Sequence, residues 1–151
     1  MPKSTNQKTK LLHLSRILLN QTDEEHPLTV PQLIEGLARQ DIKAERKSIY
    51  DDLEALRLFG MDVQSRKGRS PGWFVGERDF ELPEVKLLMD AVQSSRFITQ
   101  KKSDALIHKL EKLTSVHQAG QLQRQVFVDR RIKVMNESIY YNVDKLHAAI
   151  A

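Results

Sequence analysis

The N-terminal half of the chain alternates apolar stripes with polar breaks. The first stripe has the spacing of one helical face and predicts a helix over about residues 7–20. Its members are Leu11, Leu12, Leu14, Ile17 and Leu18. The polar run over residues 23–27 interrupts the pattern and predicts a loop.

A second helix is predicted to open at Thr29. Gln32 follows three residues later, which is the spacing of a capping box, and Pro31 sits in the first turn, where its missing N–H is harmless. The buried stripe of this helix is predicted to consist of Val30, Leu33, Ile34 and Leu37.

A third helix is predicted over residues 44–59, after a short turn at residues 40–43. Ile49, Leu53 and Leu56 repeat at helical spacing and are expected to face the first two helices, while Gly60 ends the helix. The opposite face then carries Arg46, Lys47, Tyr50 and Asp51. Asp52 is expected to tie this helix to a cation of the first helix, for which Arg16 is the candidate.

Two short segments beyond Gly60 read as the strands of a hairpin. Residues 62–65 form the first, residues 72–75 form its return, and residues 66–71 form the loop between them. The loop carries three cations, Arg66, Lys67 and Arg69, and contains Gly68.

The C-terminal half is predicted to be helical. A helix starts at Pro83 and runs to about Ser95, and Thr99 caps the next one, with Leu106, Leu110 and Leu113 on its inner face. A shorter helix covers residues 115–122, residues 126–128 are extended, and a last helix has the apolar stripe Ile139, Val143, Leu146 and Ile150. The expected fold is mainly α with a small β-hairpin, divided into residues 1–76 and a helical linker or dimerisation segment over residues 77–151.

Composition narrows the class of protein. The chain has no cysteine, which excludes disulfides and thiolate metal sites, and no apolar run is long enough to span a membrane. The N-terminus lacks the apolar stretch of a secretory signal, so a cytoplasmic location is expected. The net charge is +4, and each half carries 12 basic and 10 acidic residues. A case for nucleic acid therefore depends on where the charges lie.

Three helices followed by a hairpin with a basic tip is the layout of a winged helix-turn-helix. The third helix can enter the major groove of double-stranded DNA, where Arg46 can pair with guanine while Lys47 and Tyr50 hold phosphates. The basic loop can follow the sugar-phosphate backbone, and the start of the second helix suits a phosphate. The candidate DNA-binding residues are Thr29, Lys43, Arg46, Lys47, Ser48, Tyr50, Arg66, Lys67 and Arg69.

Structural interpretations of the same residues stay open. A basic turn is often a solvated hairpin, and Tyr50 can simply pack on the hairpin while Arg46 stays in solvent. The alternative function is a winged-helix module that docks an acidic protein partner and does not bind DNA specifically. A further alternative is that the chain regulates an enzyme fused downstream of it.

The sequence also resembles a known family. Residues 28–34, the stretch Glu45-Arg46-Lys47-Ser48-Ile49-Tyr50-Asp51-Asp52-Leu53 and residues 59–63 are similar to DeoR-like winged-helix regulators. The likeness is closer to bacterial transcription regulators that carry a C-terminal WYL domain, which residues 22–29, 78–84 and 87–99 also resemble, and it spans about residues 8–150. The resemblance implies transcription regulation, homodimers and an effector ligand bound by a C-terminal part.

Two features of the chain depart from the pattern of that family. Many members have arginine where this chain has Asp51, and the tryptophan-tyrosine-leucine signature and its barrel are absent. The chain stops about where that barrel begins in its relatives, so we expect it to be a fragment of a longer regulator, with a naturally truncated relative as the alternative.

Catalytic and metal-binding patterns are not found. The five histidines are scattered without metal-ligand spacing, and the adjacent Asp51 and Asp52 point in different directions on a helix. The glycines of residues 68–72 lack the Lys-Ser/Thr of a phosphate loop. No enzyme activity, metal or cofactor is expected.

Overall fold

The computed structural model describes residues 6–126, 136 and 138–150, and for residues 124–126 and 140 it describes the backbone alone. The described chain is mainly helical and contains one two-stranded antiparallel sheet, which confirms the expected fold class at that level. It divides into two units. The first runs up to Asp79 and includes Ser115–His117, and the second holds Phe80–Thr114 and the described residues from Gln118 onward.

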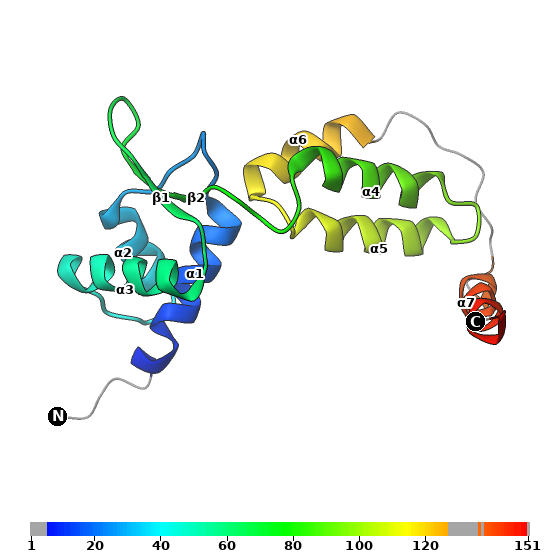
Figure 1. The fold of residues 1–151 in the computed structure, drawn as a ribbon, viewed down its shortest axis with the longest axis horizontal. Coiled ribbons are helices and arrows are strands. Elements are labelled where there is room, and N and C mark those ends of the chain that lie inside the picture. Colours follow the sequence, from blue (N-terminus) through cyan, green and yellow to red (C-terminus); the bar gives the residue numbers. More distant parts are fainter. Residues whose placement is uncertain (1–5, 127–135, 137, 151) are drawn as a thin grey trace. The chain divides into compact units, whose positions relative to one another are not determined.

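The first unit is built on three helices and a hairpin (Figure 1). Their bounds are α1 Lys10–Gln21, α2 Val30–Ala38, α3 Arg46–Phe59, β1 Val63–Arg66 and β2 Gly72–Val75. The expected start of the first helix at residue 7 is corrected, because Gln7–Thr9 form a 3-10 turn ahead of α1. These residues precede the apolar stripe and have no face to bury, which explains the looser turn.

The core of the first unit is one cluster drawn from all its elements. Its buried apolar residues are Leu14, Ile17, Leu18, Val30, Leu33, Leu37, Ile42, Ile49, Leu53, Leu56, Val63 and Val75. Ile42 belongs to a turn that the sequence pattern marks as polar, yet it is fully buried. The left-handed backbone of Asp41, with φ 56°, turns the chain so that the Ile42 N–H donates to the carbonyl of Leu37.

The predicted start of α2 and the predicted C-terminal end of α3 are confirmed. Thr29 and Gln32 form the reciprocal capping box, with Pro31 in the first turn of α2. Gly60 ends α3 in the left-handed conformation, with φ 109°. The start of α3 is later than expected, because residues 44 and 45 are not helical and Glu45 occupies the cap position without a side-chain bond.

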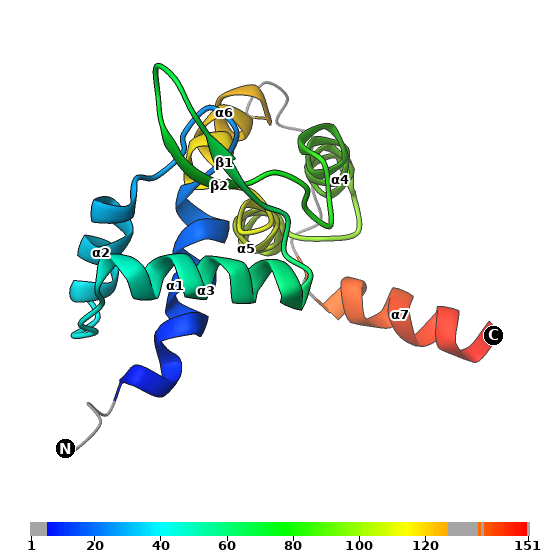
Figure 2. The ribbon, with the colours of Figure 1, turned by 60° about the vertical axis from the view of Figure 1, so that its left-hand side comes forward.

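The hairpin pairs Val63 with Val75 and Arg66 with Gly72. Arg66 is therefore the last residue of β1, and the loop expected to begin at residue 66 begins one residue later. In both Figure 1 and Figure 2 the tip of the hairpin projects away from α1 and α3.

A polar cluster closes the end of α1 and anchors the chain after the hairpin. The Thr22 hydroxyl accepts from the Val75 N–H at 3.1 Å, and Arg78 donates to the carbonyls of Leu19 at 2.8 Å and Thr22 at 2.7 Å. These bonds keep Arg78 in the first unit, which explains why the division falls after Asp79 and not after residue 76. Burial lowers the pKa of Arg78, and the charge of Asp23 opposes that shift.

Asp23 is the buried carboxylate of this cluster, with 4% exposure. It accepts bonds from the Ser115 hydroxyl at 2.5 Å, from the N–H of His26 at 3.0 Å and from that of Glu25 at 3.1 Å, and it pairs with the His26 ring at 2.7 Å. Burial by itself raises the pKa of Asp23, but the bonds from Ser115 and His26 and the interaction with His26 together leave the pKa lowered. The ring of His117 stacks on that of His26, with centroids 3.8 Å apart.

The second unit contains the helices α4 Leu82–Ser94, α5 Gln100–Glu111, most of α6 Val116–Val126, and α7 Ser138–Ile150. Thr99 caps α5 as expected, by accepting from the Lys102 N–H. Ser103 and Ile107, not Leu106, are the buried residues of α5, and Ser103 bonds the carbonyl of Val92 on α4 at 3.4 Å. Figures 1 and 2 show α4 and α5 side by side.

Two expectations about the end of the chain are corrected or left aside. Val126, expected to be extended, is the last residue of α6, which continues past residue 122 because Ala119, Leu122 and Val126 have helical spacing. Residues 127 and 128 lie outside the described residues.

On α7, Val143 and His147 line an apolar groove of about 480 Å³ with residues of α4 and α5, while Leu146 and Ile150 are exposed. No helix within the described residues is both long and apolar enough to cross a membrane.

Candidate nucleic-acid interface

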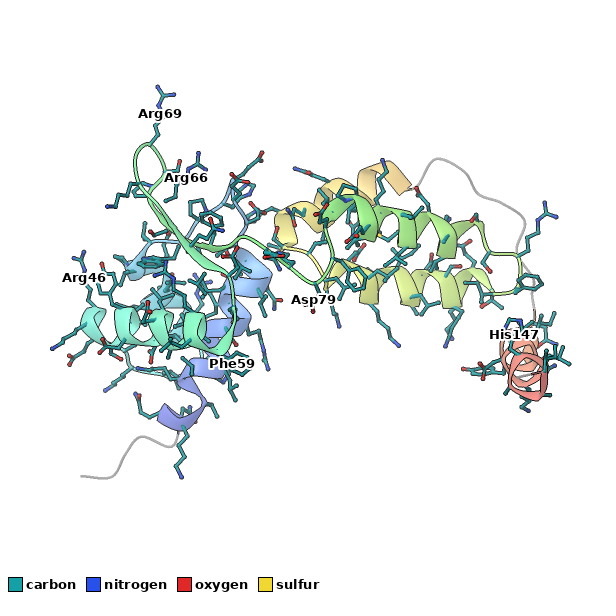
Figure 3. All side chains as sticks on the ribbon, in the orientation of Figure 1. Arg46, Phe59, Arg66, Arg69, Asp79 and His147 are labelled. Carbon is teal, nitrogen blue, oxygen red and sulfur yellow. The ribbon has the colours of Figure 1, made fainter. Side chains whose placement is uncertain are left out.

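The rotation of α3 about its axis decides which of its side chains meet the hairpin. Ile49, Leu53 and Leu56 are at most 3% exposed and face the core. One edge of α3 therefore carries Arg46 and Tyr50 toward the hairpin, and the opposite edge carries Ser48 and Asp52 toward α1. Figure 3 shows Arg46 at one end of α3 and Phe59 at the other.

The hairpin is held against the start of α2 by backbone pairing. Leu28, next to the cap residue Thr29, exchanges both backbone hydrogen bonds with Trp73 of β2, at 2.9 and 2.7 Å. Gly72 permits this approach, because a Cβ at that position would lie 2.7 Å from the Leu28 carbonyl. The start of α2, the start of α3 and the hairpin are thereby brought to one place.

These three elements enclose a surface concavity of about 300 Å³. Its lining residues come from α2 and its cap, from α3, and from both strands with their loop: Thr29, Val30, Pro31, Arg46, Tyr50, Ser65, Arg66, Lys67, Pro71, Gly72 and Trp73. Three of them are cationic and none is acidic. Five of the nine candidate residues from the sequence analysis, Thr29, Arg46, Tyr50, Arg66 and Lys67, thus share one site.

The start of α2 contributes less hydrogen-bonding capacity than expected. The Thr29 hydroxyl donates to the Gln32 side chain at 2.9 Å, and the Thr29 N–H donates to the same oxygen at 2.8 Å. The Gln32 N–H donates to the Thr29 hydroxyl, and Pro31 has no N–H. Within the first turn, Val30 is the residue whose N–H the capping box does not use.

Arg46 and Tyr50 are both exposed and touch each other weakly. The guanidinium of Arg46 donates to the Tyr50 hydroxyl over a long 3.4 Å, and its carbon lies 6.0 Å from the centre of the Tyr50 ring. The Tyr50 ring also packs edge-on against Trp73, with centroids 6.1 Å apart. This ring contact places Tyr50 against the hairpin and leaves its hydroxyl with the long bond from Arg46.

The hairpin cations are not equivalent. Arg66 donates to the backbone carbonyl of Glu24 at 2.7 Å, so its side chain is already fixed to the loop between α1 and α2. Lys67 is exposed and lines the concavity. Arg69 extends from the hairpin tip, away from the concavity (Figure 3).

The remaining candidate residues do not line the concavity. Lys43 and Lys47 are exposed, the first in the turn before α3 and the second on its outer face. The Ser48 hydroxyl contacts the ammonium of Lys10 on α1, so Ser48 faces away from the hairpin. The expected partner of Asp52 is also corrected: Lys10, and not Arg16, lies 2.7 Å from its carboxylate.

Two residues that the sequence analysis did not single out connect the parts of the site. Arg57 of α3 lies over the ring of Trp73, with 5.1 Å from its guanidinium carbon to the ring centre, and Trp73 contacts Tyr50. The spacing of residues 46, 50 and 57 places all three on one edge of a helix, and that spacing is a signal the sequence does contain.

Among the described residues, no group of three or more histidines or carboxylates could hold a metal ion. Comparisons with protein-family models, with curated proteins and with solved structures find no match. The geometry and charge of the concavity are therefore the basis for assigning a function.

Proposed function

We propose that this chain binds double-stranded DNA in a sequence-specific manner as part of transcription regulation. In this proposal the first unit acts as a winged helix-turn-helix, with α2 and α3 as the helix pair and the hairpin as the wing. The start of α3 enters the major groove, which is about 12 Å wide and admits a helix. The hairpin then lies along the sugar-phosphate backbone beside it.

The observation that carries the proposal is the charge of the concavity. Arg46, Arg66 and Lys67 line it together, and no acidic side chain does. The chain as a whole is only weakly basic, at +4, so this separation of charge is local. When such a surface neutralises the phosphates of DNA, the counterions condensed on the DNA are released into solution, which favours the complex.

The cations are expected to contact different parts of the DNA, because they are held in different ways. Arg46 stands at the start of α3 and has a planar guanidinium, which matches the two acceptors of a guanine edge. Lys67 and Arg69 belong to a loop, where cationic side chains can follow phosphates without reading bases. Arg66 is held by its hydrogen bond to the Glu24 carbonyl, so its charge stays beside the proposed course of the DNA sugar-phosphate backbone.

The direct test is selection of duplexes from a random pool with the full chain, followed by titration of the selected duplex over a range of salt concentrations. We expect a recurring sequence motif and a linear fall of log K with log salt. Retention of all duplexes alike would contradict sequence-specific binding. A protein-docking surface would give no recurring motif, because its cations would attract all duplexes alike.

The partner state proposed with this function is a homodimer, since paired half-sites about one helical turn apart require two copies. Leu146 and Ile150 of α7 are 61% and 81% exposed in the single chain, although they belong to one apolar stripe. Sedimentation of the chain at micromolar concentration tests this, and a monomer at every concentration would exclude the dimer.

A further inference from the structure

Trp73 is the chain's single tryptophan, and its ring meets α3 at two separate points. The guanidinium carbon of Arg57 lies 5.1 Å from the ring centre, within the range of a cation–π contact. The Tyr50 ring meets it edge-on, at 66° between the planes. A single side chain of β2 thus contacts two turns of α3.

Arg57 binds the hairpin a second time. Its Nε donates to the backbone carbonyl of Val63 at 2.6 Å, so the same guanidinium touches β1 through a hydrogen bond and β2 through the Trp73 ring. A lysine in this position could keep the charge but could not make both contacts with a planar group. Arg57 therefore connects α3 to both strands.

The contacts continue to the residue expected to read bases. Tyr50 lies between Trp73 and Arg46, and its hydroxyl accepts the long hydrogen bond from Arg46. The four side chains follow one another as Arg57, Trp73, Tyr50 and Arg46. We call this set the aromatic bridge.

We propose that Trp73 is a positioning residue, and that the aromatic bridge fixes the hairpin and α3 in one orientation so that the hairpin cations and Arg46 engage a duplex together. This inference rests on the proposed DNA binding. A two-stranded hairpin is at best marginally stable by itself, so its orientation has to come from packing against other elements. Loosening the bridge should weaken base reading and phosphate binding at once, although Trp73 itself carries no charge.

The test uses substitutions that keep the charge of the site. Trp73→Leu removes the ring, Trp73→Phe keeps a smaller ring, and Arg57→Lys keeps the charge but removes the planar group. Arg39→Lys is the matched control: Arg39, the exposed cap residue after α2, is paired with Glu35 one turn away, as Arg57 is with Glu54. Circular dichroism and thermal melting identify which variants are folded.

With the selected duplex, we expect Trp73→Leu to lower the affinity ratio of selected to scrambled duplex about tenfold. The same variant should flatten the salt dependence by roughly 0.9 for every phosphate that the protein no longer neutralises. Arg57→Lys should act in the same direction and less strongly, while Trp73→Phe recovers part of the ratio. Arg39→Lys should match wild type. Folded Trp73→Leu and Arg57→Lys variants with an unchanged ratio and salt slope would overturn the proposal.

A measurement without DNA separates this inference from the proposed function. Because Trp73 is the single fluorophore of its kind, its emission and its quenching by acrylamide report on the bridge directly. Arg57→Lys should change both, and Arg39→Lys should change neither. Unchanged emission in Arg57→Lys would overturn the bridge itself, whereas altered emission without any selected duplex would overturn the DNA-binding function and with it the positioning role.

Discussion

The ammonium of Lys10 on α1 lies 2.7 Å from the carboxylate of Asp52 on α3, and only 13% and 17% of these two side chains are exposed. The Ser48 hydroxyl contacts the same ammonium. This pair fixes the edge of α3 that faces away from the hairpin. It therefore supports the rotation of α3 that brings Arg46 and Tyr50 to the other edge.

Removing one partner of this pair should destabilise the first unit. Lys10→Met leaves a poorly solvated carboxylate, and we expect a decrease of about 1–3 kcal/mol in the free energy of unfolding. The double variant Lys10→Met with Asp52→Leu should recover most of this decrease, since no charge is left unpaired. Urea denaturation measures both. Arg39→Met, which breaks the exposed pair with Glu35, is the control and should cost at most about 0.5 kcal/mol.

Asp23 should make stability depend on acid pH. Its pKa is lowered in the folded state, so its contribution is present above the pKa of the unfolded chain, about 3.9, and disappears as pH falls through the folded value. Asp23→Asn should cost about 1–3 kcal/mol at pH 7, and the difference from wild type should shrink below about pH 4. Thermal unfolding between about pH 3 and pH 7 measures this. A constant difference over that range would show that the charge of Asp23 is not what stabilises the cluster.

Two glycine substitutions should differ in severity for a steric reason. Gly60→Ala meets no atom within 4 Å, so its cost comes from the positive φ alone and should be about 1 kcal/mol. Gly72→Ala places a methyl group 2.7 Å from the Leu28 backbone and should also separate the hairpin from the start of α2. We expect Gly72→Ala to lower stability more than Gly60→Ala does. Only Gly72→Ala should weaken DNA binding. Equal effects in denaturation and binding assays would contradict the close approach.

The hairpin loop should supply affinity without base preference. Replacing Lys67 and Arg69 by alanine should reduce the slope of log K against log salt by roughly 0.9 for each phosphate that these side chains neutralise. Arg66 is left in place because it also bonds the Glu24 carbonyl. The control replaces the exposed Lys109 and Lys101, which changes the net charge equally. If both double variants alter the slope alike, the effect is one of overall charge and the hairpin is not at the interface.

Arg46 should read sequence. We expect Arg46→Ala to relax preference at one or two base pairs, by about 1–3 kcal/mol of discrimination, when duplex selection is repeated. Arg39→Ala should return the original motif, and so should Arg46→Ala if α3 does not enter the groove. Tyr50→Phe tests how the Tyr50 hydroxyl contributes. If that hydroxyl binds a phosphate, the variant binds all duplexes more weakly and to the same extent, whereas if it orients Arg46, the variant has a lower preference among duplexes.

Local patterns were sufficient to predict several helix ends and the return strand of the hairpin. The Thr29 capping box, the Gly60 end of α3 and the Thr99 cap of α5 each depend on residues a few positions apart, and the structure confirms all three. The return strand was predicted at its observed bounds, because β-branched and aromatic residues follow a turn-forming loop there.

Contacts between distant segments were not predictable in the same way. Lys10 and Arg16 both lie on α1, and only the packing of α1 against α3 decides that Lys10 reaches Asp52. Ile42 looked polar by context, although the left-handed turn at Asp41 carries it into the core. For the site, the sequence placed Arg46 and Lys67 together but missed Trp73 and Arg57, because their contact depends on the orientation of the hairpin.

The pairing of Leu28 with Trp73 also affects how the sheet can be extended. A two-stranded sheet has two outer edges, and an uncovered edge can recruit a strand from another molecule and start aggregation. Leu28 takes both backbone hydrogen bonds of Trp73 on the outer side of β2. An intruding strand would have to displace the residue that leads into α2. The loop between α1 and α2 therefore shields β2 against edge-to-edge association.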